Sequence, residues 1–226
     1  MTDKILTVNN LTIKYENKAE PAVENLSFSL EKGETVGLFG KSGCGKSSVA
    51  WTIMGRIDNM GGRAAGEIVF ENVNLLAIED KTWHDIRWKK LAIVPQSSMN
   101  ALNPVYKIKK TLMETMTRYM PTCSLVEMEK KCEELIDMVY LDYRVLHCYP
   151  HELSGGMQQR VFIALATMLN PDLLILDEAT TGLDVIVEAN ILQTLMRIKQ
   201  EKNMTMLFIS HDARIHDAFC DRRINL

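Results

Sequence analysis

Apolar and polar residues alternate near the N-terminus with the period of two that is typical of strands. Residues 5–8 and 11–15 alternate on either side of Asn9-Asn10, which predicts a β-hairpin with its turn at the two asparagines. Residues 23–30 predict a third strand. The N-terminal region is therefore expected to form a small antiparallel β subdomain.

The rest of the chain alternates between strand patterns and helical patterns. Residues 34–39 are nearly all apolar and predict a strand that runs into a glycine-rich loop, and residues 46–56 have helical character. Further strands are predicted at 67–70, 91–95, 173–176 and 204–209, and helices at 108–119, 126–140, 156–169, 185–199 and 213–219. This order predicts an α/β fold, with a mostly parallel sheet flanked by helices. The helix-rich middle is expected to be a lobe inserted into that core.

Composition narrows the possible roles. A chain of 226 residues with 46% hydrophobic content is expected to form one substantial domain, or a core with a smaller lobe. The apolar stretch near residues 161–169 is about half of the roughly 20 residues that a membrane-spanning helix needs. Residues 1–4 lack the features of a secretory signal, which favours synthesis in the cytoplasm without export. A net charge of -3 lacks the basic excess of nucleic-acid binders, so DNA and RNA are not expected partners.

The cysteines predict neither a disulfide framework nor a metal site. Their number is odd and none forms a CxxC pair, so reduced thiols are expected. Cys132, His147, Cys148 and His151 are zinc-type ligands, but the adjacent His147 and Cys148 point in different directions on any regular element. The cysteines are Cys44, Cys123, Cys132, Cys148 and Cys220.

A phosphate-binding loop is the first chemical motif. The sequence GKSGCGKS at residues 40–47 matches GxxxxGK[ST] and lies between a predicted strand and a predicted helix, as the loop's chemistry requires. Its glycines let backbone N–H groups converge on phosphate oxygens at the positive end of the helix. Lys46 is expected to reach the β- and γ-phosphates of ATP, and the Ser47 hydroxyl to bind Mg²⁺. The residues expected to contact the nucleotide here are Gly40, Lys41, Ser42, Gly43, Cys44, Gly45, Lys46, Ser47 and Ser48.

Two carboxylates follow the apolar strand predicted at residues 173–176. Asp177 closes that strand, where an unpaired charge would be costly, so we assign it to Mg²⁺, directly or through water. Glu178 is then placed to polarise a water for attack on the γ-phosphate. The alternative role for this pair is a simple helix cap, but the phosphate loop in the same sequence favours the catalytic role.

A second anion site is predicted at Ser154-Gly155-Gly156, because these residues open a predicted helix with a hydroxyl and free N–H groups. They belong to the run LSGGMQQR at residues 153–160. With the phosphate loop and the acidic pair, this run resembles the ATP-binding cassette of ABC transporters. The resemblance implies one cassette over residues 1–226, with a core at about 1–96 and 161–226 and a helical subdomain at about 97–160. It also implies that two cassettes pack head to tail, each ATP lying between one loop and the other's signature.

The same resemblance assigns roles to further residues. Gln96 resembles the glutamine that joins core to lobe and binds magnesium and water, and His211 resembles the switch histidine that orients the attacking water. Asp184 ends TGLD at residues 181–184, which corresponds to the loop at the cassette interface. Tyr15 stands where the family places an aromatic ring against adenine; a core aromatic is the alternative.

A narrower resemblance is to the oligopeptide, dipeptide and nickel importer branch. It is carried by YPHELSGGM at residues 149–157, LNPV at 102–105 and Asp184-Val185. The implied system has two cassettes, identical or different, two membrane permeases and an extracytoplasmic binding protein. This chain would lie on the cytoplasmic face of the membrane, and the segment after Gln96 would help to grip a permease. Peptides or chelated nickel would be the imported solutes.

Departures from the family leave alternatives open. Ala179 replaces a usual proline and Gly182 a usual alanine, changes that hydrolysis is expected to survive. Relatives continue beyond residues 221–226, so the chain is either a truncated product or a short cassette with an unfinished sheet edge. One rival function is a soluble mechanical ATPase acting on ribosomes or chromosomes, but the usual second cassette or long coiled coil is missing. Another is a regulatory cassette without turnover, against which the retained Lys46, Gln96, Asp177, Glu178 and His211 argue.

Overall fold

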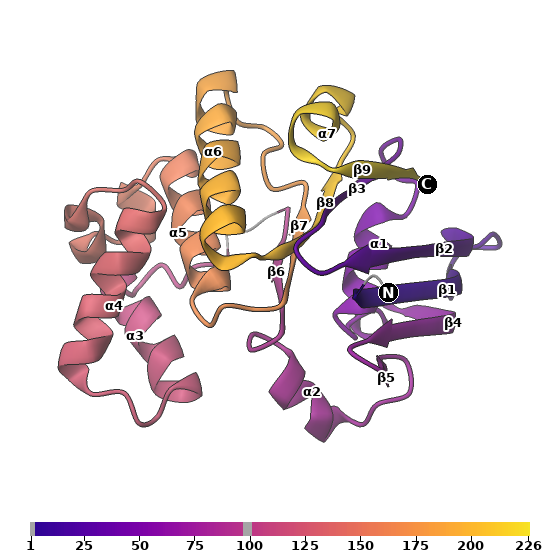
Figure 1. Ribbon diagram of the computed structural model, residues 1–226, viewed down its shortest axis with the longest axis horizontal. Helices are drawn as coiled ribbons and strands as arrows, with labels where there is room; N and C mark the ends of the chain where they lie inside the picture. The colour runs from indigo at the N-terminus through magenta and orange to yellow at the C-terminus, as the bar shows by residue number, and fades with distance from the viewer. Residues whose placement is uncertain (1–2, 97–100) are drawn as a thin grey trace.

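The computed structural model describes residues 3–96 and 101–226, and its strands form two sheets (Figure 1). One sheet has four strands in the order β2-β1-β4-β5, and the other has five in the order β6-β7-β8-β3-β9. All pairs in the first sheet are antiparallel and all pairs in the second are parallel. The predicted α/β fold with an antiparallel N-terminal subdomain is confirmed.

The hairpin predicted at Asn9-Asn10 is wrong. β1 runs without interruption from Lys4 to Tyr15 and pairs with β2 on one side and β4 on the other. Both registers shift at this point, and Asn10 has a φ of 48°. The left-handed conformation that asparagine tolerates therefore produces a β-bulge within one strand instead of a turn between two. The bounds of this sheet are β1 Lys4–Tyr15, β2 Val23–Glu31, β4 Gly62–Phe70 and β5 Val73–Asn74.

The parallel sheet brings the ends of its strands to one edge. β3 lies between β8 and β9, and β7 lies between β6 and β8. Because parallel strands all run in one direction, the loops that follow them leave from the same side of the sheet. The bounds are β3 Thr35–Phe39, β6 Leu91–Val94, β7 Leu173–Asp177, β8 Thr205–Ser210 and β9 Arg222–Asn225.

The predicted helices are all present, and the structure adds three short elements, α2, β5 and β9. These did not stand out in the sequence because they are short, and α2 buries only Trp83 and Ile86. No helix in the described ranges is long and apolar enough to cross a bilayer. The helices are α1 Lys46–Ile53, α2 Asp80–Ile86, α3 Ile108–Tyr119, α4 Leu125–Met138, α5 Gly155–Thr167, α6 Val185–Lys202 and α7 Ala213–Phe219, with 3₁₀ turns η1 Asp58–Met60, η3 Tyr143–His147 and η4 Pro150–Glu152.

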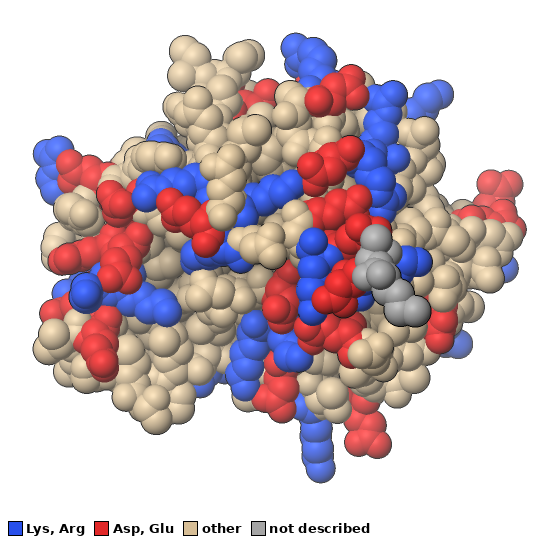
Figure 2. Space-filling view, viewed as in Figure 1, with Lys and Arg blue, Asp and Glu red and all other residues tan. Residues whose placement is uncertain are grey.

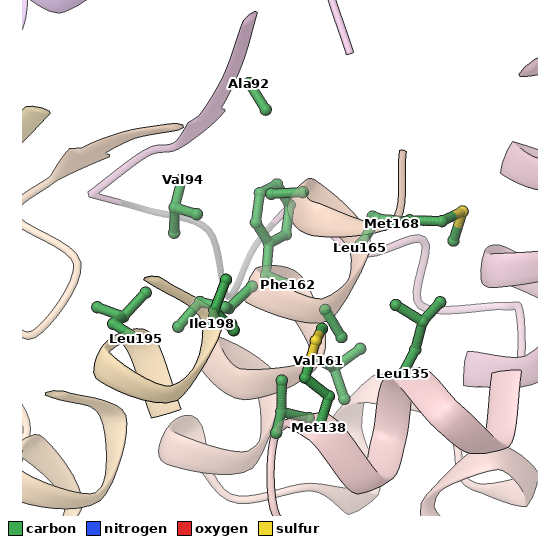
Figure 3. Packing of buried hydrophobic residues seen from close by; sticks show 14 of the residues in the cluster. Ala92, Val94, Leu135, Met138, Val161, Phe162, Leu165, Met168, Leu195 and Ile198 are labelled. Atoms are coloured by element: carbon green, nitrogen blue, oxygen red, sulfur yellow. The ribbon is translucent and has the colours of Figure 1, made fainter. Parts of the chain in front are cut away.

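The core lies on the two faces of the parallel sheet. Leu174 and Leu176 of β7 face the cluster formed with α3 to α7, whereas Leu173 and Ile175 face the cluster formed with α1 and the antiparallel sheet. This alternation is the period of two of a strand buried on both faces. Figure 3 shows Phe162 of α5 packed among side chains of β6, α4 and α6. The helical lobe and the sheet therefore share one continuous apolar cluster.

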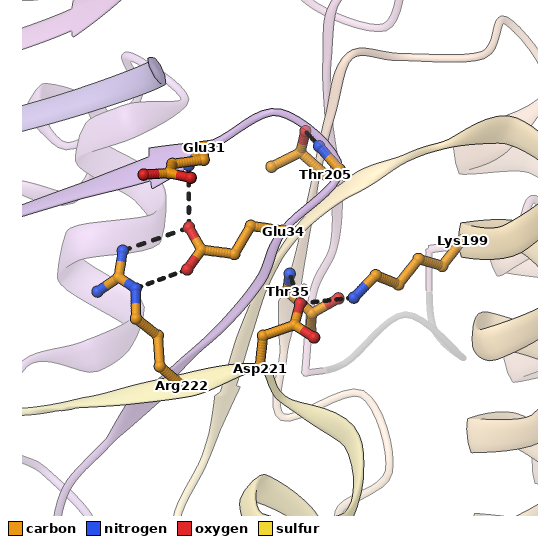
Figure 4. A network of polar contacts seen from close by, with 8 residues as sticks. Glu31, Glu34, Thr35, Lys199, Thr205, Asp221 and Arg222 are labelled. Atoms are coloured by element: carbon orange, nitrogen blue, oxygen red, sulfur yellow. Dashed lines mark hydrogen bonds and ion pairs between the residues drawn. The ribbon is translucent and has the colours of Figure 1, made fainter. Parts of the chain in front are cut away.

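Ion pairs fix β9 at the edge of the sheet (Figure 4). Arg222 donates through Nε to Glu34 Oε1 at 2.6 Å and also bonds Ser29 O. Asp221 Oδ2 accepts from the Thr35 amide at 2.7 Å and from Lys199 Nζ at 2.6 Å. These contacts join β9 to β3 and to α6.

Charges on the surface are mixed in sign. On the face shown in Figure 2, basic and acidic side chains are interspersed and do not gather into one large basic area. Several form exposed ion pairs, such as Lys89 with Asp85 at 2.8 Å. Exposed pairs of this kind add little to stability, so the surface charge bears mainly on solubility.

Candidate nucleotide site

The loops after four parallel strands meet at one edge of the sheet. β3 leads into the glycine-rich loop, β6 into Gln96, β7 into Glu178 and β8 into His211. A cavity of about 420 Å³ lies there, which we call the edge cavity. The edge cavity is lined by Tyr15, Asn17, Lys18, Ala22, Ser42, Gly43, Gly45, Lys46, Ser47, Ser48, Met60, Gln96 and Glu178.

The glycine-rich loop needs a glycine at position 45 for two reasons. Gly45 has a φ of 102°, which residues with a side chain rarely adopt. A Cβ at this position would also lie 2.6 Å from Ala22 O. Gly45 is the N-cap of α1, so the loop delivers the first turn of that helix to the cavity. Backbone N–H groups at a helix start form a site for an anion.

Lys46 brings a positive charge into the loop. Its side chain is 4% exposed, and Nζ donates to Gly40 O at 2.8 Å and to Lys41 O at 2.9 Å. Both acceptors are uncharged carbonyl oxygens, and no ion pair of Lys46 with a carboxylate occurs among the residues described. A buried cation is costly unless an anion balances it. The loop therefore fits the phosphates of a nucleotide.

Ser47 and Asp177 supply oxygen ligands beside the loop. Ser47 Oγ donates to Asp177 Oδ1 at 3.0 Å, and Asp177 is 2% exposed. Burial raises the pKa of Asp177 to about 6; the Ser47 hydrogen bond lowers it and the charge of Glu178 raises it. With the amide of Gln96 nearby, the donor set is a hydroxyl, a carboxylate and an amide oxygen. Mg²⁺ prefers such ligands, so the residues fit the predicted ion.

Glu178 lies between Gln96 and His211. Gln96 Nε2 donates to Glu178 Oε2 at 3.2 Å, and His211 Nδ1 lies 3.5 Å from Glu178 Oε1. The Glu178 backbone has a φ of 49°, and its amide donates to Ile209 O at 2.9 Å. A positive φ at a residue with a side chain is strained, and such strain occurs often at functional sites. Three polar side chains from separate strand ends thus converge on one point.

Tyr15 lines the edge cavity and also packs against the core, and its stacking on adenine stays a prediction. Its hydroxyl lies 2.8 Å from Ser48 Oγ, and its ring packs against the cluster on the α1 side. Lys18 Nζ lies 5.9 Å from the centre of the ring. Tyr15 therefore ties the end of β1 to the helix that follows the glycine-rich loop.

The second predicted anion site lies at the start of α5. Ser154 is its N-cap, and its hydroxyl accepts from the Met157 amide at 3.3 Å. Asp184 caps α6 in the same way, accepting from Val187 N at 2.9 Å. None of Ser154, Gly155, Gly156 or Asp184 is among the described residues that line the edge cavity. One chain therefore keeps its two predicted anion sites apart.

Comparisons with known proteins assign the chain to a family. A family model described as ABC transporter matches residues 23–181. The chain belongs to the ABC transporter family. It is 34% identical to a dipeptide transport ATP-binding protein of Lactococcus lactis over 97% of this chain and 64% of that protein. It is 38% identical to an ATP-binding protein of a metal-staphylopine import system from Staphylococcus aureus, over 96% of this chain and 80% of that protein.

A solved ABC cassette has the same fold. It is a dimeric ATP-binding cassette bound to ADP and Pi in a post-hydrolysis state. The two chains superpose with a TM-score of 0.82 at 29% identity, over 98% of this chain and 94% of the other. The present chain spans 64% of the length of the Lactococcus relative, which is longer.

Four residues that line the edge cavity of this ABC family member were not predicted. Asn17 and Lys18 follow Tyr15 closely, so the turn after β1 was a usable signal. Ala22 and Met60 reach the cavity through tertiary packing, and the sequence offered no sign of this. Among the described residues, no three His, Cys, Asp or Glu side chains group to hold a metal ion. All five cysteines are free thiols, and burial raises the pKa of Cys132 to about 11.

Proposed function

We propose that the chain is the ATP-hydrolysing subunit of an ABC importer for peptides or chelated metal ions. The observation that carries the proposal is the meeting of the Lys46 loop with Glu178, Gln96 and His211 at one edge of the sheet. The named relatives, one for dipeptides and one for metal-staphylopine, support import of such solutes. The family alone would leave the chemistry of this site open.

ATP would bind with its phosphates in the glycine-rich loop. The backbone N–H groups at the start of α1 and the Lys46 ammonium would hold the β- and γ-phosphates. Tyr15 would stack on the adenine, with its ring fixed by the 2.8 Å contact to Ser48. Ser47, Gln96 and Asp177 would hold Mg²⁺, which supplies charge neutralisation at the phosphates when bound.

Hydrolysis would use the group around Glu178. The carboxylate accepts a proton from a water molecule, while the Gln96 amide and the His211 imidazole keep that water in line with the γ-phosphorus. The water oxygen forms a bond to the γ-phosphorus as the bond from the γ-phosphorus to the β–γ bridging oxygen breaks, and ADP and inorganic phosphate leave. The contacts of 3.2 Å from Gln96 Nε2 and 3.5 Å from His211 Nδ1 to the Glu178 carboxylate support this division of roles.

A second cassette would complete the site. Ser154, Gly155 and Gly156 would bind the γ-phosphate held by the loop of the other cassette, and Asp184 would lie at the interface. Their separation from the edge cavity of their own chain supports this assignment. Residues 97–160, of which 97–100 lie outside the described residues, would act as the helical subdomain and contact the permeases. Two permeases and an extracytoplasmic binding protein would complete the importer, with this chain at the cytoplasmic face of the membrane.

The test is the Glu178→Gln variant. We expect it to bind Mg-ATP as the unchanged chain does and to lose most phosphate release, because the attacking water loses its base. Removal of a general base slows a reaction by about 10² to 10⁴ fold. Equilibrium binding of labelled ATP and a phosphate-release assay measure the two effects separately. Unchanged release in the variant would contradict the assignment, and weakened binding would point to a damaged site.

A further inference from the structure

A buried histidine lies behind the loop that carries His211. His216 belongs to α7 and is 2% exposed. Its Nε2 lies 3.1 Å from Ser210 O, the last residue before His211. Its ring packs edge-on against Phe39, 5.5 Å away, and Phe208, 5.8 Å away. His216 therefore touches the strand end that leads to the glycine-rich loop and the strand end that leads to His211.

The direction of the hydrogen bonds follows from the partners. A carbonyl oxygen only accepts, so Nε2 of His216 carries the proton and donates to Ser210 O. Nδ1 then has a lone pair, and Cys220 Sγ lies 3.6 Å from it. Burial raises the pKa of Cys220 to about 12, so the thiol keeps its proton and donates to Nδ1. One chain of hydrogen bonds thus runs from the Cys220 thiol through the imidazole to the Ser210 carbonyl.

β3 leaves no room for the ring to move. A Cβ on Gly37 would lie 1.9 Å from His216 Nδ1 and 3.0 Å from Cys220 Sγ. The bare backbone of β3 at Gly37 is therefore what admits the imidazole. Any shift of the ring has to displace β3 or α7, because packed interiors yield little.

We propose that His216 is a positioning residue for ATP hydrolysis. By holding the Ser210 carbonyl, it fixes the loop that places His211 3.5 Å from the Glu178 carboxylate. Through Phe39 it keeps that loop in register with the strand that enters the glycine-rich loop. This inference rests on the proposed function, since a positioning residue needs a reaction to serve.

This arrangement favours the neutral imidazole. Burial and the charge of Arg223 on β9 lower the pKa of His216 below its usual value, against the opposing Ser210 bond and the charges of Asp217 and Asp212. The imidazole is thus neutral near pH 7. A proton added at Nδ1 would displace the Cys220 thiol hydrogen from that nitrogen and place a positive charge among buried rings. We therefore expect turnover to fall at acidic pH as His216 is protonated, and a side chain that does not titrate at this position should not show that fall.

The test compares His216→Leu with His216→Gln in the full chain. Leucine removes both hydrogen bonds, so kcat for Mg-ATP is expected to fall five- to tenfold per folded molecule, with KM changed less than twofold. Glutamine can donate to Ser210 O and accept from the Cys220 thiol, so it is expected to keep more than half of kcat. The glutamine variant should also lose less activity than the wild type as the pH falls.

The control is Thr167→Val in α5. This change removes a buried 2.8 Å hydrogen bond to Ile163 O, and it should lower stability with kcat unchanged.

Two measurements, kcat and amide hydrogen exchange, test the inference. Wild-type kcat in His216→Leu, or an equal loss in the glutamine and leucine variants, overturns the inference. Amide hydrogen exchange at residues 211–213 is the second measurement, and needs no turnover. Exchange there should accelerate at least tenfold in His216→Leu and stay near wild type in His216→Gln. Equal exchange in the wild type, His216→Leu and His216→Gln overturns the inference. A wild-type chain that releases no phosphate would instead contradict the proposed function.

Discussion

The starts of α1 and α5 use the same chemistry in different surroundings. Each offers backbone N–H groups at a helix start, after Gly45 in one case and Ser154 in the other. The start of α1 has the buried Lys46, the Ser47–Asp177 pair and a cavity of about 420 Å³. Ser154 is exposed and lies outside that cavity. The comparison teaches that the two helix starts differ in the elements that enclose them, so the proposed second site would need a partner molecule to enclose a phosphate.

The largest expected effect comes from removing the charge at the first site. Lys46→Ala should weaken Mg-ATP binding at least about 100-fold, because hydrogen bonds to charged groups contribute about 1.5–3 kcal/mol each. Calorimetric titration of the purified chain measures this. Lys89→Ala, which removes an exposed lysine paired with Asp85, should leave the affinity unchanged. A comparable loss in both variants would mean that the effect is one of net charge.

The next effect concerns the buried carboxylate. The folded chain keeps the Asp177 proton up to about pH 6, whereas an unfolded aspartate ionises near 3.8. Unfolding is therefore increasingly favoured as the pH rises from 3.8 to about 6. Asp177→Asn should thus stabilise the nucleotide-free chain at pH 7 by about 3 kcal/mol while weakening binding of Mg-ATP.

Urea unfolding of both chains at pH 4 and pH 7 measures this difference. The gain in stability should nearly vanish at pH 4, where the wild-type carboxyl is largely protonated in the folded state. An equal gain at both pH values would show that ionisation of Asp177 is not its cause.

The smallest effect tests whether the second site needs a partner. Ser154→Ala should cost about 1 kcal/mol of stability through the lost cap and leave Mg-ATP binding to the single chain unchanged. In the Glu178→Gln background it should weaken ATP-dependent dimers, as measured by sedimentation velocity. Ser124→Ala is the matched control, since Ser124 caps α4 through Glu127 N at 3.3 Å. It should cost similar stability without affecting dimers, and equal dimers in both variants would contradict the role of Ser154.

Local pattern was enough to predict much of this molecule. The apolar run of β3, the glycine-rich loop and α1 follow one another in sequence, so their contacts are local. The meeting of Gln96, Glu178 and His211 followed from the family resemblance and from the shared direction of parallel strands. Their individual roles stay predictions, as does the division of the chain at residues 97–160.

The rest could not be read from the sequence because it depends on tertiary packing. Asn10 has the left-handed conformation expected of a turn, yet pairing with β2 and β4 on both sides converts it into a bulge. Met60 reaches the cavity from η1 without any local signal. Nothing in the pattern of α7 distinguishes His216 from a surface histidine, because seven residues are too few to define a buried face.

The backbone conformation at Glu178 sets stability against the proposed catalytic role of this residue. At a φ of 49°, glycine has no steric strain, and asparagine has less strain than glutamate. A library of random variants selected only for thermal stability should therefore be enriched in glycine or asparagine at position 178, and these variants should be stable but unable to hydrolyse ATP. Selection for turnover is what would hold glutamate in this unfavourable conformation.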